Sequence, residues 1–214
     1  VTLNGRKVEA DIDPNMMLLD FVRAQGMKSV KRGCDTGNCG LCTLWVDDKP
    51  VLSCSTLAMR ANGKNVTTLE GVQKEAEEFS RFLALEGADQ CGFCSPGFIM
   101  SAKGLLDENP SPTREEVRDW FHKHRNLCRC TGYKPLVDAV MDAAKVMRGE
   151  MNKEDLLFKQ VENNSIVGSK YVRPSAVAKV TGTWDFGSDM ILQMPDNTLH
   201  LALAQAEVAH ANII

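Results

Sequence analysis

The spacing of hydrophobic positions changes along the chain, and residues 1–72 predict a small domain of strands and short helices. Apolar and polar side chains alternate around Asn4-Gly5, a dipeptide typical of two-residue β-hairpin turns. Residues 14–25 place apolar side chains on one side of a helix that should begin after Asp13 and end at Gly26. Further strands are expected at 41–46, 50–54 and 65–69, the first two joined by Asp47-Asp48.

From residue 73 to residue 148 the apolar positions recur at helical spacing, which predicts four helices. Thr113 with Glu116 makes a capping box before the third helix, and Ser95 before Pro96 is typical of a helix start. The expected helices lie at about 74–85, 96–107, 114–124 and 135–147. Together their apolar faces favour a four-helix bundle.

The last part of the chain divides into a polar stretch and a third region. Residues 149–167 are predicted to be a surface linker. Within residues 168–214, strands are expected at 180–184 and 199–203, which are too few for an independent hydrophobic core. We therefore expect 168–214 to be the start of a domain that is cut short, with its remainder on another chain or removed. The predicted fold class is α+β.

Composition narrows the range of functions. The chain has 214 residues, 43% of them hydrophobic, and a formal net charge of −3 without a basic patch, so no nucleic-acid partner is expected. No apolar run approaches the roughly 20 residues that a membrane-spanning helix needs, and the first ten residues are too polar for a secretion signal. A cytoplasmic protein without a membrane partner is therefore expected.

The eight cysteines are the strongest chemical signal in the sequence. They cluster at short spacings in a chain without an export signal, which favours metal ligation over disulfides. The first set combines the C-x4-C-x2-C spacing of plant-type [2Fe–2S] ferredoxins with one cysteine further on. Glycines in this loop should let backbone N–H groups approach the sulfur atoms. The set comprises Cys34, Cys39, Cys42 and Cys54.

The second set joins a C-x2-C pair to a C-x-C pair and comprises Cys91, Cys94, Cys128 and Cys130. Each pair precedes a predicted helix, and helix N-termini favour an anionic cluster. Four thiolates also suit tetrahedral zinc, whose sites favour two separated C-x2–4-C knuckles. That preference argues against zinc in the glycine-rich first set, but it leaves zinc open for the second set taken alone.

Three motifs in this order resemble the iron–sulfur region of the molybdenum hydroxylases, the xanthine oxidase family. They are residues 33–42 with Cys54, residues 90–97 (QCGFCSPG) and residues 128–133 (CRCTGY). The resemblance implies a ferredoxin-like β-grasp domain at 1–72, followed by a helical [2Fe–2S] domain at 73–148. Residues 168–214 look like the opening of the family's molybdenum-binding portion.

The resemblance also implies cofactors. Two [2Fe–2S] clusters would be held, an inner one near the molybdenum by Cys91, Cys94, Cys128 and Cys130, and an outer one by Cys34, Cys39, Cys42 and Cys54. Gln90 and Cys130 would contact a molybdopterin, as its cytosine dinucleotide, that is shared with the molybdenum-binding portion. Flavin-containing members carry an FAD domain or subunit where this chain has only about 20 residues, so no FAD is expected in it. Leu41 replaces a residue that is commonly small, and this difference is expected to alter packing or the reduction potential at the exposed face without removing a ligand.

The implied activity is that of the flavin-free aldehyde oxidoreductases of anaerobic bacteria. Such an enzyme oxidises an aldehyde to a carboxylic acid and passes electrons through the inner and outer clusters to a flavodoxin or ferredoxin. Other implied partners are the rest of the molybdenum-binding domain or subunit and a second copy, in a homodimer of the full enzyme. No catalytic residue is expected in this chain. The alternatives are the iron–sulfur part of a xanthine or N-heterocycle dehydrogenase, a free-standing carrier and a double-zinc module.

Overall fold

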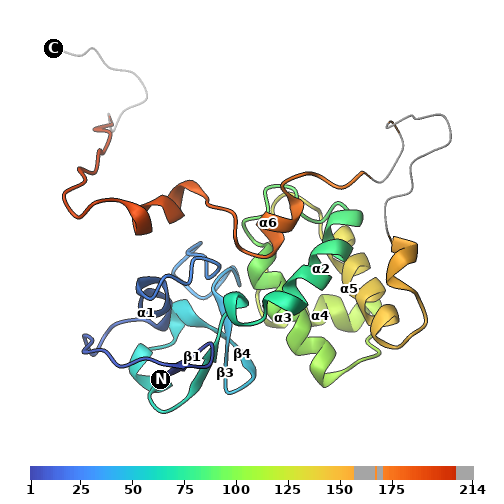
Figure 1. Cartoon of the computed structure of the whole chain (residues 1–214), viewed down its shortest axis with the longest axis horizontal. Helices are drawn as coiled ribbons and strands as arrows, with labels where there is room; N and C mark the ends of the chain where they lie inside the picture. Colours follow the sequence, from blue (N-terminus) through green and yellow to red (C-terminus); the bar gives the residue numbers. More distant parts are fainter. Residues whose placement is uncertain (157–166, 168–170, 206–214) are drawn as a thin grey trace.

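A small mixed sheet of five short strands forms one lobe of the structure (Figure 1). The computed structural model describes residues 1–156, 167 and 171–205. The strands are β1 (Thr2–Leu3), β2 (Arg6–Lys7), β3 (Thr43–Val46), β4 (Lys49–Leu52) and β5 (Asn65–Thr67). Their order is β2-β1-β5-β3-β4, and β1 and β5 are parallel while the other neighbours are antiparallel. With helix α1 (Leu18–Ala24) packed on it, this sheet forms the predicted β-grasp domain.

Two predicted turns form because their residues adopt positive φ angles. Asn4 and Gly5 have φ of 49° and 79°, which joins β1 to β2 as a two-residue hairpin requires. Asp47 and Asp48 have φ of 50° and 62° and join β3 to β4 in the same way. Asparagine and aspartate tolerate this backbone region better than most residues.

Helix α1 starts later than the sequence predicted. The helix expected from residue 14 begins at Leu18, while Met17 pairs with Leu57 in an isolated β-bridge. The N–H of Leu18 donates to the carbonyl of Thr56 at 2.7 Å. The residues before α1 thus use their backbone hydrogen bonds on a neighbouring segment, and this long-range pairing overrides the local helix signal at Asp13.

All four predicted helices of the second lobe are confirmed, namely α2 (Gln73–Leu85), α3 (Ser95–Glu108), α4 (Arg114–Lys123) and α5 (Lys134–Met147). The capping box forms as predicted, since Glu116 N donates to Thr113 Oγ1 at 3.2 Å and Thr113 N donates to Glu116 Oε2 at 2.6 Å. Ser95 is not a cap. It lies inside the first turn of α3, and Cys94 takes the N-cap position.

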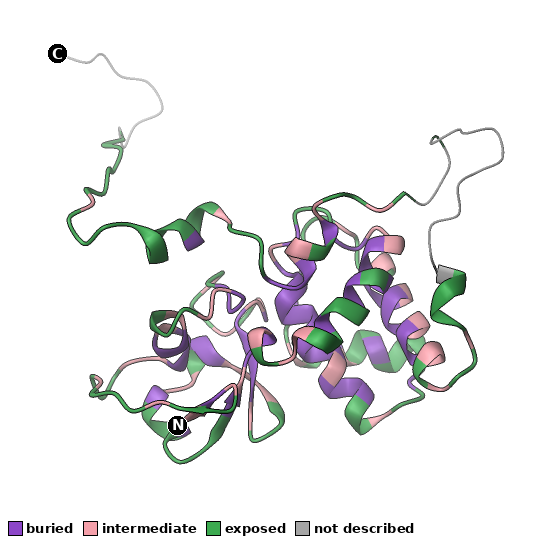
Figure 2. Cartoon of the chain, in the orientation of Figure 1, coloured by how far each residue is buried: buried purple, intermediate pink, exposed green. Residues whose placement is uncertain are grey.

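The two lobes have separate hydrophobic cores that meet along β3 and α3 (Figure 2). Trp45 of β3 is 5% exposed and belongs to the core of the helices, not to the core under α1. Its indole N–H donates to the carbonyl of Met100 in α3 at 2.8 Å. The sheet and the helices are thus packed against each other.

Both strands predicted in the last region are wrong. In place of the strand predicted at 180–184, helix α6 (Ala176–Val180) ends at Val180 and a turn follows. Val180 is buried in the core of the helical lobe. The 3₁₀ helix η5 (Gly187–Gln193) comes next. Residues 199–203 have no regular structure, and their leucines are exposed. Their apolar and polar positions do alternate, but they pair with none of the five strands in the described part of the chain.

The predicted linker is described only in part. The short 3₁₀ helix η4 (Lys153–Leu156) lies against α2, and residues 157–166 fall outside the described residues. Among the described helices, none is long and apolar enough to cross a membrane.

Candidate metal centres

The first cysteine set occupies the loop between α1 and β3 and the turn after β4. Cys42 and Cys54 are buried, whereas the other two cysteines of the set are half-buried. Cys54 lies in the 3₁₀ turn η1 (Ser53–Ser55), not in the strand predicted at 50–54, which ends earlier. Ser53 donates to the carbonyl of Cys42 from its backbone N–H (3.3 Å) and its hydroxyl (2.7 Å), which holds the two buried cysteines together.

Hydrogen-bond donors surround the sulfur of Cys34. The N–H of Asn38 lies 3.3 Å from Cys34 Sγ. Burial alone would raise the pKa of Cys34, but hydrogen bonds from the backbone and hydroxyl of Thr36 and from Asn38 lower the pKa to about 6. At neutral pH this thiol is mainly a thiolate, which is the form that binds iron. The loop backbone therefore stabilises negative charge on sulfur, as the sequence predicted.

The thiols of the first set form two pairs. Burial, followed by a hydrogen bond with Cys34, raises the pKa of Cys39 to about 11. Burial, followed by a hydrogen bond with Cys42, raises the pKa of Cys54 to about 12. The charge of Cys34 also acts on Cys54, so the two pairs are neighbours.

The second set repeats this arrangement. A hydrogen bond with Cys128, together with burial, raises the pKa of Cys94. The same bond and the hydroxyl of Thr131, which donates to Cys128 Sγ at 3.2 Å, lower the pKa of Cys128 to about 5 against the effect of burial. Cys91 hydrogen-bonds with Cys130 and raises its pKa. Cys94 and Cys128 are buried, whereas Cys91 and Cys130 are exposed.

Two helix starts position the second set. Cys94 is the N-cap of α3, and α5 begins directly after the turn that carries Cys128 and Cys130. The N–H of Cys128 donates to the hydroxyl oxygen of Tyr133, the N-cap of α5, at 3.1 Å. The positive ends of two helix dipoles thus lie beside the cysteines, which favours an anionic group there.

The thiol pairs within each set agree with the way in which a two-iron cluster is bound. In a [2Fe–2S] cluster each iron takes two of the four cysteines, whereas tetrahedral zinc takes all four. All eight cysteines are free of disulfides. The two thiol pairs of each set therefore match the two cysteines that each iron of a binuclear cluster takes.

Hydrogen bonds connect the two sets directly. The N–H of Leu127, the residue before Cys128, donates to the carbonyl of Cys39 at 3.0 Å. The side chain of Asn126 donates to the carbonyl of Gly40 at 3.3 Å. The loop of the first set therefore rests on the backbone that leads into the second set.

Leu41 does not lie at an exposed face, so that expectation is wrong. Its half-buried side chain packs against the core of the helices. The backbone of this loop lies close to α3 because Gly97 has no side chain, and a Cβ there would lie 2.5 Å from the Gly40 carbonyl oxygen and 3.1 Å from the Cα of Leu41. A larger residue at position 41 therefore fills the junction between the two lobes.

Gln90 lies on the surface beside the exposed thiol pair. It precedes Cys91, which hydrogen-bonds with Cys130, so the structure brings together the two residues for which a pterin contact was predicted. The carbonyl of Gln90 accepts hydrogen bonds from Arg173 (3.1 Å) and Lys179 (3.2 Å) of the last region. Two cations are thus held at the edge of this surface.

Four residues near the cysteines were missed by sequence reasoning. Thr131 and Tyr133 lie within the CRCTGY motif. The nearness in sequence of their side-chain oxygens to the cysteines could have indicated their hydrogen bonds to Cys128. Lys31 and Asp189 meet in a buried ion pair. Their separation of 158 positions left no local signal.

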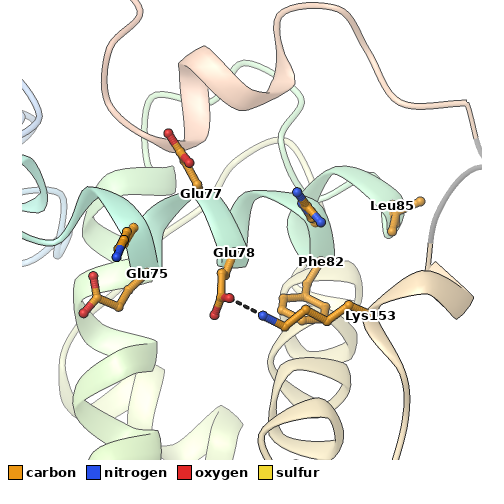
Figure 3. A pocket seen from close by; sticks show the side chains of 8 residues that line it. Glu75, Glu77, Glu78, Phe82, Leu85 and Lys153 are labelled. Carbon is orange, nitrogen blue, oxygen red and sulfur yellow. Dashed lines mark hydrogen bonds and ion pairs between the residues drawn. The ribbon is translucent and has the colours of Figure 1, made fainter.

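One hollow in the described structure lies away from the cysteines. Its volume is about 540 Å³, and it lies along the exposed face of α2 (Figure 3). Glu75, Glu77 and Glu78 line it, and Lys153 of η4 reaches across to pair with Glu78. This is a solvated, mixed-charge helix face with no ligand chemistry of its own.

A second hollow, of about 420 Å³, borders both cysteine sets. Asn38 of the first loop and Leu127 of the second lie in its wall, together with the cationic side chains of Arg118 and Arg125. Arg125 donates to Asn38 Oδ1 at 3.2 Å. We call it the basic hollow. Its lining residues are Asn38, Arg118, Phe121, His122, Arg125, Asn126, Leu127, Tyr133 and Val137, none of them acidic.

Two family models match the chain in this order. Residues 1–78 match the 2Fe-2S iron-sulfur cluster binding domain, and residues 68–141 match the [2Fe-2S] binding domain. Together they include all eight cysteines. The chain therefore contains two [2Fe–2S]-binding domains, and the double-zinc alternative is excluded.

Curated relatives and solved structures agree with these matches. The chain is 54% identical to the aldehyde oxidoreductase of Megalodesulfovibrio gigas, over its whole length and 24% of the relative's length. It is 44% identical to the nicotine 6-hydroxylase small subunit of Paenarthrobacter nicotinovorans, over 67% of the chain and 87% of that subunit. The solved aldehyde oxidoreductase of Desulfovibrio desulfuricans superposes with a TM-score of 0.88 at 54% identity, covering 96% of this chain and 23% of the other. The chain thus spans about a quarter of the length of its aldehyde-oxidoreductase relatives.

Proposed function

Because the chain belongs to the iron–sulfur part of the molybdenum hydroxylase family, we propose that it carries electrons out of a molybdenum-dependent aldehyde oxidoreductase. The full protein would oxidise an aldehyde to a carboxylic acid. The single observation that most supports an electron path is the hydrogen bond from Leu127 N to the Cys39 carbonyl, which joins the two cysteine sets. Bound [2Fe–2S] clusters supply one-electron carriers on each side of this bond.

The residues of the chain prepare both sites for such carriers. Asn38 N–H and Thr131 Oγ1 donate to ligand sulfurs, and such hydrogen bonds stabilise the extra negative charge of a reduced cluster. Cys42 and Cys94 keep one half of each site away from water. In this proposal the second set is the inner one, because Cys91 and Cys130 are exposed beside Gln90, and the first set is the outer one.

The experiment that tests this function combines metal analysis with electron paramagnetic resonance (EPR) on the full-length protein. We expect iron, sulfide and molybdenum, and two distinct cluster signals after reduction with dithionite. Aldehyde should reduce both clusters, whereas xanthine or an N-heterocycle should not. A preparation with both clusters that responds only to a heterocycle would move the protein to another branch of the family. A free-standing carrier is disfavoured, since α6 and η5 are packed against the two domains.

We propose that Gln90 and Cys130 contact the pterin of a molybdopterin, as its cytosine dinucleotide, which the remainder of the molybdenum-binding portion also holds. Replacing Gln90 by alanine should lower the molybdopterin content of the purified full-length protein, because an exposed amide beside the inner site is lost. Both cluster signals should persist, since Gln90 is not a ligand. Gln25→Ala, at the exposed C-cap of α1, is the control. An unchanged molybdopterin content would remove Gln90 from the proposed site.

The acceptor that we propose is an acidic flavodoxin or ferredoxin that docks at the basic hollow. The exposed side chains of Arg118 and Arg125 offer positive charge, and Leu127, which is 51% exposed, offers an apolar contact. This surface lies beside Asn38, whose N–H bonds to Cys34 of the outer site. The outer cluster would therefore lie close to a positively charged surface, and this surface complements an acidic acceptor.

Arg118→Glu should therefore raise the KM for the acidic acceptor several-fold and weaken its dependence on salt, because the association is electrostatic. Reduction of a small neutral dye by aldehyde should not change. Arg81→Glu, which lines the other hollow on α2, is the matched control. Equal KM values for the two variants would place acceptor docking elsewhere. The cytoplasmic location and the homodimer of the full enzyme stay predictions.

A further inference from the structure

Asp189 of η5 is buried where the last region of the chain meets both iron–sulfur domains. Its carboxylate accepts hydrogen bonds from Lys31 Nζ at 2.5 Å, Arg23 Nη2 at 3.2 Å and the N–H of Phe186 at 3.1 Å. The side chains of Lys31 and Asp189 have no exposed surface. A buried carboxylate held by three donors can occupy only one position, so this contact fixes η5 relative to its neighbours.

Lys31 leads directly to the outer site. It lies three residues before Cys34, and its N–H donates to the carbonyl of Leu41, between Cys39 and Cys42, at 3.3 Å. Arg23, the second cation on Asp189, also donates to the carbonyl of Val30 at 2.8 Å. The carboxylate therefore fixes the backbone at the start of the outer cysteine loop.

The same junction reaches the inner site through aromatic rings. Phe93 lies between Cys91 and Cys94, and its ring meets that of Phe186 edge to face, with centroids 5.1 Å apart and planes at 87°. Lys31 Nζ lies 4.9 Å from the Phe186 centroid and 5.9 Å from the Phe93 centroid. One short segment of the chain thus contacts the loops of both cysteine sets.

We infer that Asp189 is a positioning residue that acts through Lys31 and, with Phe186, holds the outer and inner cysteine loops at a fixed separation and orientation. This inference rests on the proposed passage of electrons between the two clusters. Electron transfer between two centres slows as their separation grows, so a loosened junction would slow it. A buried ion pair contributes little net stability, and its value here is the single geometry that it imposes.

The test compares Asp189→Asn with Asp185→Asn in the full-length protein loaded with both clusters. Asp185 pairs with Lys28 at 2.7 Å in the same segment, but at the surface, so it is a matched control for loss of a charge. The readout is the magnetic interaction between the two dithionite-reduced clusters, together with the rate of electron transfer between them after a pulse of reductant. In Asp189→Asn both cluster signals should remain. The splitting caused by the magnetic interaction should broaden, and electron transfer between the clusters should be several-fold slower. Asp185→Asn should match the parent protein.

An Asp189→Asn variant that carries both clusters with the parent interaction and rate would overturn the inference. If this variant does not load its clusters, Phe186→Leu replaces it, because that change leaves every charge of the junction in place. The same broadening is then expected, and the parent spectrum would again overturn the inference. Dithionite reduction does not need aldehyde turnover, so a protein inactive on aldehydes would refute the proposed function without affecting this test.

Discussion

Cys42→Ser is expected to abolish the EPR signal of the outer cluster while the inner signal persists. Serine oxygen is a poor substitute for a thiolate toward iron, and Cys42 is only 2% exposed, so water cannot replace it as a ligand. The pair that Cys42 forms with Cys54 would be lost, and the buried hydroxyl would cost about 1–3 kcal/mol if it found no partner. The change in signal is the largest effect that any single ligand substitution should produce.

The persistence of the inner signal is the informative part of this result. None of the four inner cysteines shares a thiol pair with the outer set, so iron binding at the two sites should be independent. Iron content should fall by half, measured together with the spectrum. Asp35→Asn changes an exposed residue of the same loop that is not a ligand, and it should keep both signals. Loss of both signals in a protein with unchanged circular dichroism would show that the sites load cooperatively.

Local sequence signals predicted the parts of the structure whose causes are local. The capping box of Thr113 and Glu116 depends on residues three positions apart, and it formed as expected. The Asn4-Gly5 turn depends on two residues that tolerate positive φ. The C-x4-C-x2-C spacing likewise lies within one loop, so the sequence was enough to propose Cys34, Cys39 and Cys42 as ligands.

The errors share a different cause. Met17 was expected in a helix but pairs with Leu57, and Val180 was expected in a strand but lies at the end of a helix that packs against the bundle. In each case a partner distant in sequence decided the conformation. The contact of Lys31 with Asp189 is the extreme example, because neither residue carries a local pattern that marks it as buried.

The arrangement of the sites could be predicted only in part for the same reason. Motif order predicted which cysteines belong together, and the positions just before two helices were also correct. The pairing within each set, and the bond from Leu127 to the Cys39 carbonyl, depend on how one loop packs on another domain. Leu41 was misplaced because its side chain packs against the core of the helical domain, whose residues are distant from it in sequence.

Gly40→Ala is expected to be the most destabilising change at the junction of the two domains. Gly40 has a φ of 67°, a conformation that costs alanine about 1–2 kcal/mol. A Cβ at this position would also lie 2.6 Å from Asn126 Nδ2 and 2.7 Å from Asn126 Cα. Both atoms belong to Asn126, which lies two residues before Cys128 of the second set. Relief of this overlap requires the two domains to move apart, which should lower the free energy of unfolding by about a further 1–3 kcal/mol.

Gly63→Ala separates these two costs. Gly63 has a similar φ of 73°, but nothing lies within 4 Å of the Cβ that would be added, so only the backbone cost applies. The melting temperature of Gly40→Ala should therefore fall below that of Gly63→Ala by roughly 2–4 °C for each kcal/mol of overlap. The hydrogen bond from Asn126 to the Gly40 carbonyl should weaken as well, and with it the magnetic interaction between the clusters. Equal melting temperatures would mean that the loop of the first cysteine set is not packed tightly against the helical domain. The hydrogen bond from Leu127 to the Cys39 carbonyl would then not fix the geometry between the two sites.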